Sequence, residues 1–201
     1  MMLPTHAVVG LALAAPLTAT HPELASAALA GAFLGSVFPD VDLYAGHRRT
    51  LHFPTIYTVL AVPAAMLAIA TAVPVTVALA FFAIGAAAHC RMDRWGGGLE
   101  LRPWEGTSEK AVYDHVRNEW RTPKRWIPYD GAREDFLLAA SVGVPLFVLL
   151  EGPFRWVVAV ALLVAGTYAA LRRRLADLAP VVFGYVPDRL SQYVPERYRA
   201  P

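Results

Sequence analysis

A polar stretch, F-P-D-V-D-L-Y-A-G-H-R-R-T-L-H-F, occupies residues 38–53 of a chain that is otherwise strongly apolar. Asp40 and Asp42 flank one valine, so in an extended backbone both carboxylates leave on the same side. His47 and His52 follow within ten residues. Aspartate and histidine together favour a borderline divalent ion, Zn²⁺ first and Mn²⁺ or Fe²⁺ if carboxylates dominate. The stretch therefore predicts either a metal-binding loop or a plain polar turn between two helices.

The composition places the chain among membrane proteins. Apolar residues make up 56% of the 201 residues and charged residues 17%, and the mean hydropathy is +0.42. A soluble core does not need this much apolar sequence. The net charge of only +2 gives no support to binding of nucleic acid. The single cysteine, Cys90, excludes a disulfide within the chain.

Apolar runs bounded by proline, glycine or charge recur along the whole sequence. They predict an all-α, polytopic membrane protein with about six transmembrane helices. The runs lie at about 5–20, 23–38, 54–71, 74–92, 133–150 and 153–171. We expect four regions: helices with motifs over 1–93, an interfacial loop region over 94–132, two helices over 133–171 and a basic tail over 172–201.

Basic residues predict the orientation in the membrane. With six spans, seventeen of the eighteen Lys and Arg residues fall on one side, and Arg155 alone falls on the other. The positive-inside rule makes the basic side cytoplasmic, so both termini are expected in the cytoplasm of a cell or inner membrane. The tail beyond Arg172 is either a segment that rests on anionic lipid or a plain stop-transfer signal.

The link over 94–132 is too long for a simple connection and is expected to fold on the membrane surface. Leu99–Arg102 alternates like a short strand. Thr107 or Ser108 can cap a following helix, whose apolar residues recur at spacing four up to Trp120. The link's tryptophans and tyrosines are expected to anchor it at the interface or to shape a pocket for an amphiphile.

Five of the six histidines fall on the predicted cytoplasmic side, and His21 falls outside. His89 and Asp93 are four residues apart, so on a helix they share one face and can bind one ion. The only indication that His115 could be a ligand is its predicted side of the membrane, so we expect it to be a surface residue. The candidate ligands are His6, Asp40, Asp42, His47, His52, His89 and Asp93. Seven ligands exceed the four of a structural zinc, which favours an open or two-metal site in which His6 is a ligand or an orienting residue.

The order of these motifs resembles the YdjM/YbcI-type membrane-bound proteins, a prokaryotic family described as metal-dependent hydrolases. The resemblance rests on a histidine near the start, P-D-x-D after the second apolar run, H-R-x-x-x-H close behind and H-x-x-x-D ending a later helix, and it covers residues 1–93. The family's second motif commonly reads H-R-G-x-T-H-S, in which Arg49, Leu51 and Phe53 replace the glycine, threonine and serine here. The resemblance implies hydrolysis with a divalent metal.

We therefore expect a hydrolase that acts on a lipid-associated ester or phosphoester at the cytoplasmic face. One of Asp40, Asp42 and Asp93 is expected to serve as general base or to bridge two ions, and Arg48 to hold a phosphate group bidentately. Two further hypotheses come from other classes. A metal-stapled scaffold or sensor needs a closed coordination shell, whereas a divalent-ion transporter needs acidic or histidine residues near the middle of its helices, which the apolar runs almost lack.

Overall fold

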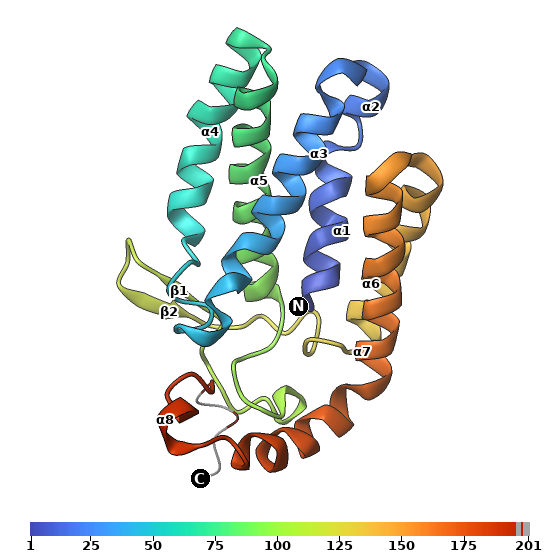
Figure 1. Ribbon diagram of the computed structural model, residues 1–201. Coiled ribbons are helices and arrows are strands. Elements are labelled where there is room, and N and C mark those ends of the chain that lie inside the picture. Colours follow the sequence, from blue (N-terminus) through green and yellow to red (C-terminus); the bar gives the residue numbers. More distant parts are fainter. Residues whose placement is uncertain (196–197, 199–201) are drawn as a thin grey trace.

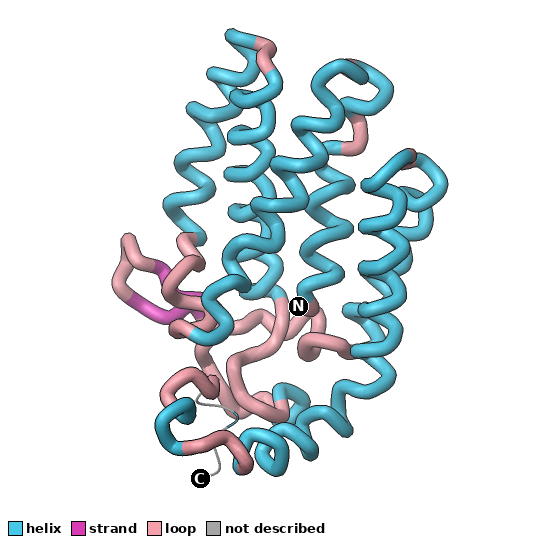
Figure 2. Tube along the Cα trace, viewed as in Figure 1, coloured by secondary structure: helices cyan, strands magenta, loops and turns pink. Residues whose placement is uncertain are grey.

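The computed structural model describes residues 1–195 and residue 198, and most of them are helical (Figure 2). The remainder of the expected basic tail, at 196–197 and 199–201, lies outside the described residues. The elements are α1 (Leu3–Ala14), α2 (Leu17–Thr20), α3 (Pro22–Val37), the 3₁₀ helix η1 (Phe38–Tyr44), α4 (Pro54–Thr71), α5 (Pro74–Trp95), the 3₁₀ helix η2 (Pro103–Glu105), β1 (Val112–Asp114), β2 (Glu119–Arg121), α6 (Arg133–Leu149), α7 (Gly152–Gly184) and α8 (Asp188–Ser191).

Proline sets where several of the long helices begin. Pro22, Pro54 and Pro74 are the first residues of α3, α4 and α5, where the missing N–H removes no hydrogen bond and the fixed φ suits a helix. α4 ends at Thr71 and is followed by Ala72, which adopts a left-handed conformation with φ of 50°, and the chain then reverses into α5. The apolar run at 54–71 thus coincides with one helix.

Five helical segments among the described residues are long and apolar enough to cross a membrane. They are Leu3–Thr20, Pro22–Tyr44, Pro54–Thr71, Pro74–Trp95 and Gly152–Gly184. The expected helix at 133–150 is present as α6, which has 17 residues and packs against α7. Large apolar side chains are exposed along the helices, for example Ile69 at 83% and Val148 at 74%. Such a surface is consistent with a membrane protein.

Close packing of α3 on α5 forms the centre of the helical bundle (Figure 1). Gly31 and Gly35, spaced as G-x-x-x-G, meet the backbone carbonyls of Ala78 and Phe82 so closely that a Cβ at either glycine would overlap them. Small residues of this kind let membrane helices approach each other. α1 packs against α3 on one side and against α6 and α7 on the other. The close approach fixes the last turn of α5 beside the start of η1.

Both ends of the described chain lie at the same end of the bundle as η1, the β-hairpin and the link over 94–132 (Figure 1). His21 lies at the junction of α2 and α3, at the opposite end. The polar motifs of the sequence therefore gather at one end of the helices, as their spacing predicted.

The link between α5 and α6 differs from the sequence-based prediction. The residues expected to form a helix up to Trp120 form an antiparallel hairpin, in which Val112 pairs with Arg121. Asn118 has a φ of 56° and reverses the chain, which a helix cannot accommodate. Leu99–Arg102 is not a strand. The predicted tail also begins differently, because α7 continues past Arg172 to Gly184.

Candidate metal centre

Four side chains from three segments converge at this end of the bundle. Asp40 comes from η1, His52 from the loop before α4, and His89 and Asp93 from the last two turns of α5, and one ligand atom from each lies within 4.8 Å of the others. The Nε2 atoms of His52 and His89 are 3.2 Å apart and lie 3.2 Å and 3.3 Å from Asp93 Oδ2. They lie 3.6 Å and 3.4 Å from Asp40 Oδ1.

These separations match the size of a tetrahedral coordination shell. Zinc ligands lie about 2.0–2.1 Å from the ion, so two ligands of a regular tetrahedron are roughly 3.3–3.4 Å apart. The five distances given above range from 3.2 to 3.6 Å. Two imidazole nitrogens and two carboxylate oxygens are also a donor set that zinc accepts. The residues therefore fit one divalent ion.

The hydrogen bonds of the two histidines fix which nitrogen faces the centre. His52 Nδ1 lies 2.9 Å from Asp42 Oδ2, and His89 Nδ1 lies 2.7 Å from the carbonyl oxygen of Ser36. Both acceptors lack hydrogens, so each Nδ1 donates, and in a neutral ring the Nε2 then carries a lone pair. Two lone pairs 3.2 Å apart repel each other unless a cation lies between them. Histidines oriented in this way are typical of metal ligands.

The second oxygen of Asp93 is held away from the cluster. His6 Nε2 lies 3.2 Å, the Met1 nitrogen 3.0 Å and an Arg48 Nη2 3.5 Å from Asp93 Oδ1. The His6 ring also stacks on His89, with ring centroids 3.8 Å apart. These contacts leave Oδ2 to face the cluster. The structure thus places His6 beside the ligands, where it orients Asp93.

Asp42 organises the loop that carries the histidines. It is buried and accepts hydrogen bonds from the backbone N–H groups of Arg48 and Leu51 as well as from His52. Its Oδ1 lies 3.1 Å from His47 Nδ1. The extended backbone expected for the two aspartates is wrong, because Phe38–Tyr44 forms a 3₁₀ helix. With three residues per turn, residues two apart point in different directions, so only Asp40 faces the cluster.

Arg48 is buried behind the ligands with a backbone φ of 59°. Its Nη1 donates to the carbonyl oxygens of Gly97 at 2.9 Å and Ala111 at 3.4 Å. Burial alone lowers the pKa of Arg48, but the carboxylate of Asp93 and other acidic groups raise it above its ordinary value. Arg48 Nε has no hydrogen-bond partner among the described residues. The guanidinium is therefore charged and keeps one buried donor unused.

The environment of His52 also favours a positive charge at the centre. Burial alone lowers the pKa of His52, but hydrogen bonds to Asp42 and Asp93 raise it above its ordinary value. The surrounding carboxylates thus stabilise a cation at this nitrogen, whether a proton or a metal ion.

Two of the candidate histidine ligands, His6 and His47, lie outside the group of four, and so does His115, which was expected to be a surface residue. His47 Nδ1 lies 3.9 Å from Asp40 Oδ1, and its side chain is partly exposed at 15%. His115 is exposed, contacts the carbonyl oxygen of Arg49 through Nε2 and packs against the ring of Phe53. His115 is therefore an exposed residue outside the group, whereas His47 lies at its edge.

Two contributors to the site carried no signal in the sequence. Ser36 acts through its backbone carbonyl, which any residue could supply. Asp135, the third residue of α6, accepts hydrogen bonds from Met2 N at 2.8 Å, Thr5 Oγ1 at 2.7 Å and Gly131 N at 3.1 Å. It joins the start of α1, which carries His6, to the start of α6. The spacing of Asp135 from α1 in the sequence gives no indication of this contact.

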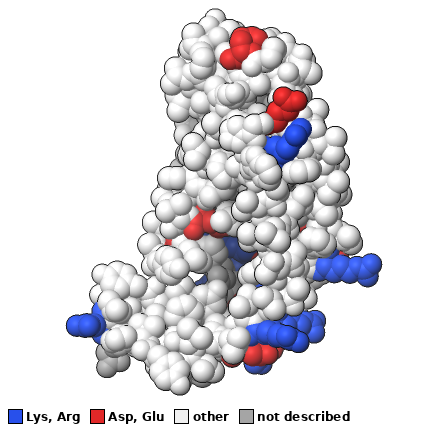
Figure 3. Space-filling model, turned by 45° about the vertical axis from the view of Figure 1, so that its right-hand side comes forward, with Lys and Arg blue, Asp and Glu red and all other residues white. Residues whose placement is uncertain are grey.

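The cluster is accessible from one side. Asp40, His47 and Arg48 line a cavity of about 890 Å³ that continues between the helices. Asp40 is 19% exposed, whereas the side chains of His52 and His89 are fully buried. The face that includes α6 and α7 shows a hollow with acidic and basic atoms at its bottom (Figure 3). A small molecule in this cavity would meet Asp40 first.

No family model, curated protein or solved structure matches the chain. The geometry of the site therefore defines it: a buried His/Asp cluster, fit for one divalent ion, at one end of a bundle of membrane-type helices.

Proposed function

We propose that the protein is a membrane-embedded, metal-dependent hydrolase that acts on a lipid-associated ester or phosphoester. The observation that carries the proposal is the position of Asp40. This residue belongs to the four-ligand cluster and also lines the large cavity. A substrate in the cavity would therefore lie beside the ion.

His52, His89, Asp93 and Asp40 would hold the ion. Zn²⁺ suits two nitrogen and two oxygen donors, and Mn²⁺ or Fe²⁺ can occupy the same set. Zinc can accept a fifth ligand, so an ion at this site would lower the pKa of a water bound beside the four side chains, and would polarise an ester or phosphoryl oxygen. The resemblance to membrane-bound metal-dependent hydrolases agrees with this chemistry.

The roles of the surrounding residues follow from their contacts. Asp40 is the most exposed of the four and is the carboxylate that can accept a proton from water entering through the cavity. Arg48 lines the cavity, where its positive charge can stabilise a phosphoryl oxygen. Asp42 keeps His52 in the required orientation, because it accepts hydrogen bonds from the His52 ring and from the backbone N–H groups of Arg48 and Leu51.

We further propose that the site lies at the cytoplasmic face of an inner or cell membrane. The support is the excess of Lys and Arg in the segments at the site end of the bundle, opposite the α6–α7 turn near Arg155. With α6 counted as a span, both termini lie on the cytoplasmic side.

A non-catalytic scaffold or sensor is the second candidate. The observation that favours it is that four protein ligands already complete a tetrahedron. An ion in a closed shell would tie η1 and the following loop to α5 without turnover. A divalent-ion transporter has less support, because the cluster lies at one end of the helices rather than near their middle.

Turnover by metal-stripped and reloaded protein separates these functions. Detergent-purified protein would be stripped with a chelator, reloaded with Zn²⁺, Mn²⁺ or Fe²⁺, and tested against phosphodiester, phosphomonoester and carboxyl-ester lipids. We expect hydrolysis to return only with metal in wild type and in His115→Ala, and to stay absent in His89→Ala. A reloaded wild type that hydrolyses none of these lipids contradicts the hydrolase and leaves the scaffold.

A further inference from the structure

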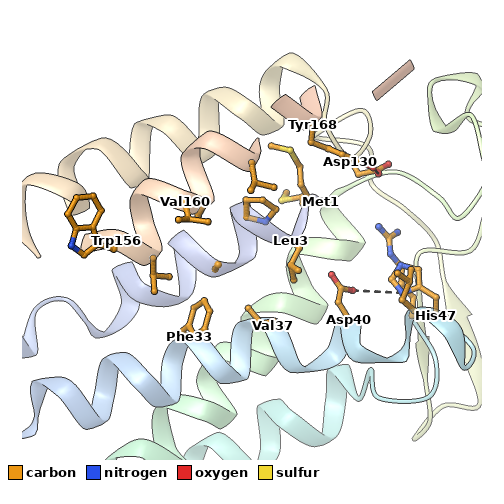
Figure 4. Close-up of a pocket in the computed structure, with 18 of the residues that line it drawn as sticks. Met1, Leu3, Phe33, Val37, Asp40, His47, Asp130, Trp156, Val160 and Tyr168 are labelled. Carbon is orange, nitrogen blue, oxygen red and sulfur yellow. Dashed lines mark hydrogen bonds and ion pairs between the residues drawn. The ribbon is translucent and has the colours of Figure 1, made fainter. Parts of the chain in front are cut away.

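The cavity beside Asp40 continues as a long groove between α3 and α7. α1 forms its floor, because α1 packs against both helices. Its lining includes Leu3 and Ala7 from α1, Phe33 and Val37 from α3, and a series of residues along α7. Figure 4 shows these side chains between the helices, with Trp156 far from the cluster and Asp40 and His47 at the other end.

Polarity changes along the groove. Trp156, Val160 and Val164 recur at spacing four on α7 and present an apolar wall, and all three are exposed in the isolated chain. At the cluster end the lining becomes polar and charged, with Asp40, Arg48 and others. A groove with one long apolar part and one charged end matches a molecule that is itself amphiphilic.

The charge at the polar end is suited to an anionic group. Asp130, which also lines the groove, is neutralised by Arg172, whose Nε lies 3.1 Å from Asp130 Oδ2. Burial alone raises the pKa of Asp130, but Arg172 lowers it below its ordinary value, so this pair carries no net charge. Arg48, which also lines the groove, is then the cation that an anionic headgroup would meet at this end, beside the Asp40 carboxylate that would bind the ion.

The length of the groove indicates how much hydrocarbon it holds. The lining residues of α7 extend from Pro153 to Tyr168, and at about 1.5 Å per residue these positions span roughly 22 Å. An extended chain of single bonds advances about 1.2 Å per bond, so roughly 18 bonds cover this distance. That length corresponds to one fatty acyl chain of an ordinary membrane lipid.

We propose that the groove between α3 and α7 holds an acyl chain of an anionic phospholipid and places the lipid's headgroup linkage beside Asp40 and Arg48. The lipid enters sideways from the bilayer, since the apolar wall of α7 is exposed in a segment that can span the membrane. The inference rests on the proposed function for the fate of the lipid, but binding of the chain is a separate property that can be measured without turnover.

Photocrosslinking in nanodiscs tests the groove directly. The probe is phosphatidylglycerol with a diazirine near the end of one 16-carbon chain, and labelled peptides are mapped by mass spectrometry. We expect labelling on α7 near Trp156 and on α3 near Phe33. Val160→Trp fills the groove and should reduce this labelling at least fivefold, whereas Val148→Trp, at an exposed position of α6 that does not line the groove, should leave it unchanged.

A chain-length series completes the test. In Val160→Trp we expect probes with 8-carbon chains to label the segment around Val37 as in wild type, because the space between Val160 and the cluster remains. Metal content measured on each sample shows whether the variant retains the folded cluster. The proposal that the groove binds an acyl chain is contradicted if labelling is spread evenly over all lipid-exposed helices. It is also contradicted if Val160→Trp leaves the labelling unchanged.

The result for the groove is distinguishable from the result for the hydrolase. Groove labelling without hydrolysis of any lipid supports the chain-binding site and contradicts the enzyme. The opposite result is hydrolysis of phosphatidylglycerol without labelling of the groove, and with Val160→Trp having no effect. That result supports the enzyme and contradicts the acyl-chain site.

Discussion

His52 Nε2 and His89 Nε2 face each other at 3.2 Å, and each ring donates its Nδ1 hydrogen to a different fixed acceptor. Neither ring can rotate to relieve the repulsion without breaking a buried hydrogen bond, which costs about 1–3 kcal/mol. The fold thus holds the two Nε2 atoms together in advance of any ligand. Such preorganisation is the property expected of a metal site.

Asp42 should control metal affinity without being a ligand. Asp42→Asn keeps the shape of the side chain but weakens the hydrogen bond that orients His52 and removes the negative charge next to it. We expect the affinity for Zn²⁺ to fall about 10- to 100-fold. Competition with a fluorescent chelator measures this change, with Asp177→Asn on the exposed part of α7 as control. Equal affinity in both variants would show that Asp42 has no part in the site.

Arg48 should separate two classes of substrate. Arg48→Lys keeps a positive charge but loses the planar guanidinium that contacts Gly97 and Asp93. We expect phosphoester hydrolysis to fall by about 10²-fold or more, and carboxyl-ester hydrolysis to fall less, because a carboxyl ester carries no anionic phosphoryl group. Parallel kinetics with the two substrates measure the difference. An equal loss for both would point to general damage rather than to phosphoryl recognition.

Gly35 should be required for the helix packing that builds the site. Gly35→Ala places a methyl group against the carbonyl of Phe82, so α3 must move away from α5. We expect a loss of about 1–3 kcal/mol in stability and weaker metal binding, because η1 carries Asp40 and follows α3 directly. Thermal unfolding in detergent provides the measurement. Gly184→Ala is the matched control and should behave as wild type, because an added Cβ there would meet no atom of the described residues within 4 Å.

The hairpin should give the fold a defined sensitivity to acid. Asp114 is buried, and although burial raises its pKa, hydrogen bonds from Arg121 and Thr55 lower it below its ordinary value. Because the folded-state pKa is the lower one, the stabilisation is present above the unfolded pKa of about 4 and is lost as the pH falls through the folded value.

Asp114→Asn removes this contribution, so we expect the variant to be less stable than wild type at pH 7 and the difference to shrink below about pH 4. Thermal unfolding from pH 7 down to pH 3 measures it. Glu109→Gln, at an exposed residue of the same link, should follow wild type throughout. A difference that stays constant down to pH 3 would contradict the assignment.

The helices were predictable because proline and apolar length define them directly, as at α4. The pair of His89 and Asp93 was predictable as well, because spacing four places both on one face of a helix. The hairpin was not, since Val112, Val116 and Trp120 show a helical spacing that the turn at Asn118 overrides. Asp42 was expected to be a ligand or base, but its direction depends on a 3₁₀ helix that no pattern in the sequence indicates.

The distance between the candidate ligands likewise could not be predicted from the sequence. It depends on how closely α3 approaches α5, and therefore on Gly31 and Gly35 meeting particular carbonyls. The groove depends on α3 and α7, which are far apart in the chain and both pack against α1. Residue types and local spacing identify a metal-binding chemistry, whereas tertiary packing decides which of the candidate residues form one site.

Metal content of purified protein, measured by plasma mass spectrometry after reloading and removal of free ions, tests the central claim most directly. We predict about one divalent ion per chain in wild type and in His115→Ala, and none in His89→Ala or His52→Ala, with all four proteins shown to be helical by circular dichroism. A folded wild type that retains no divalent ion, or a His89→Ala variant that retains as much as wild type, would contradict the assignment of this cluster as a metal centre.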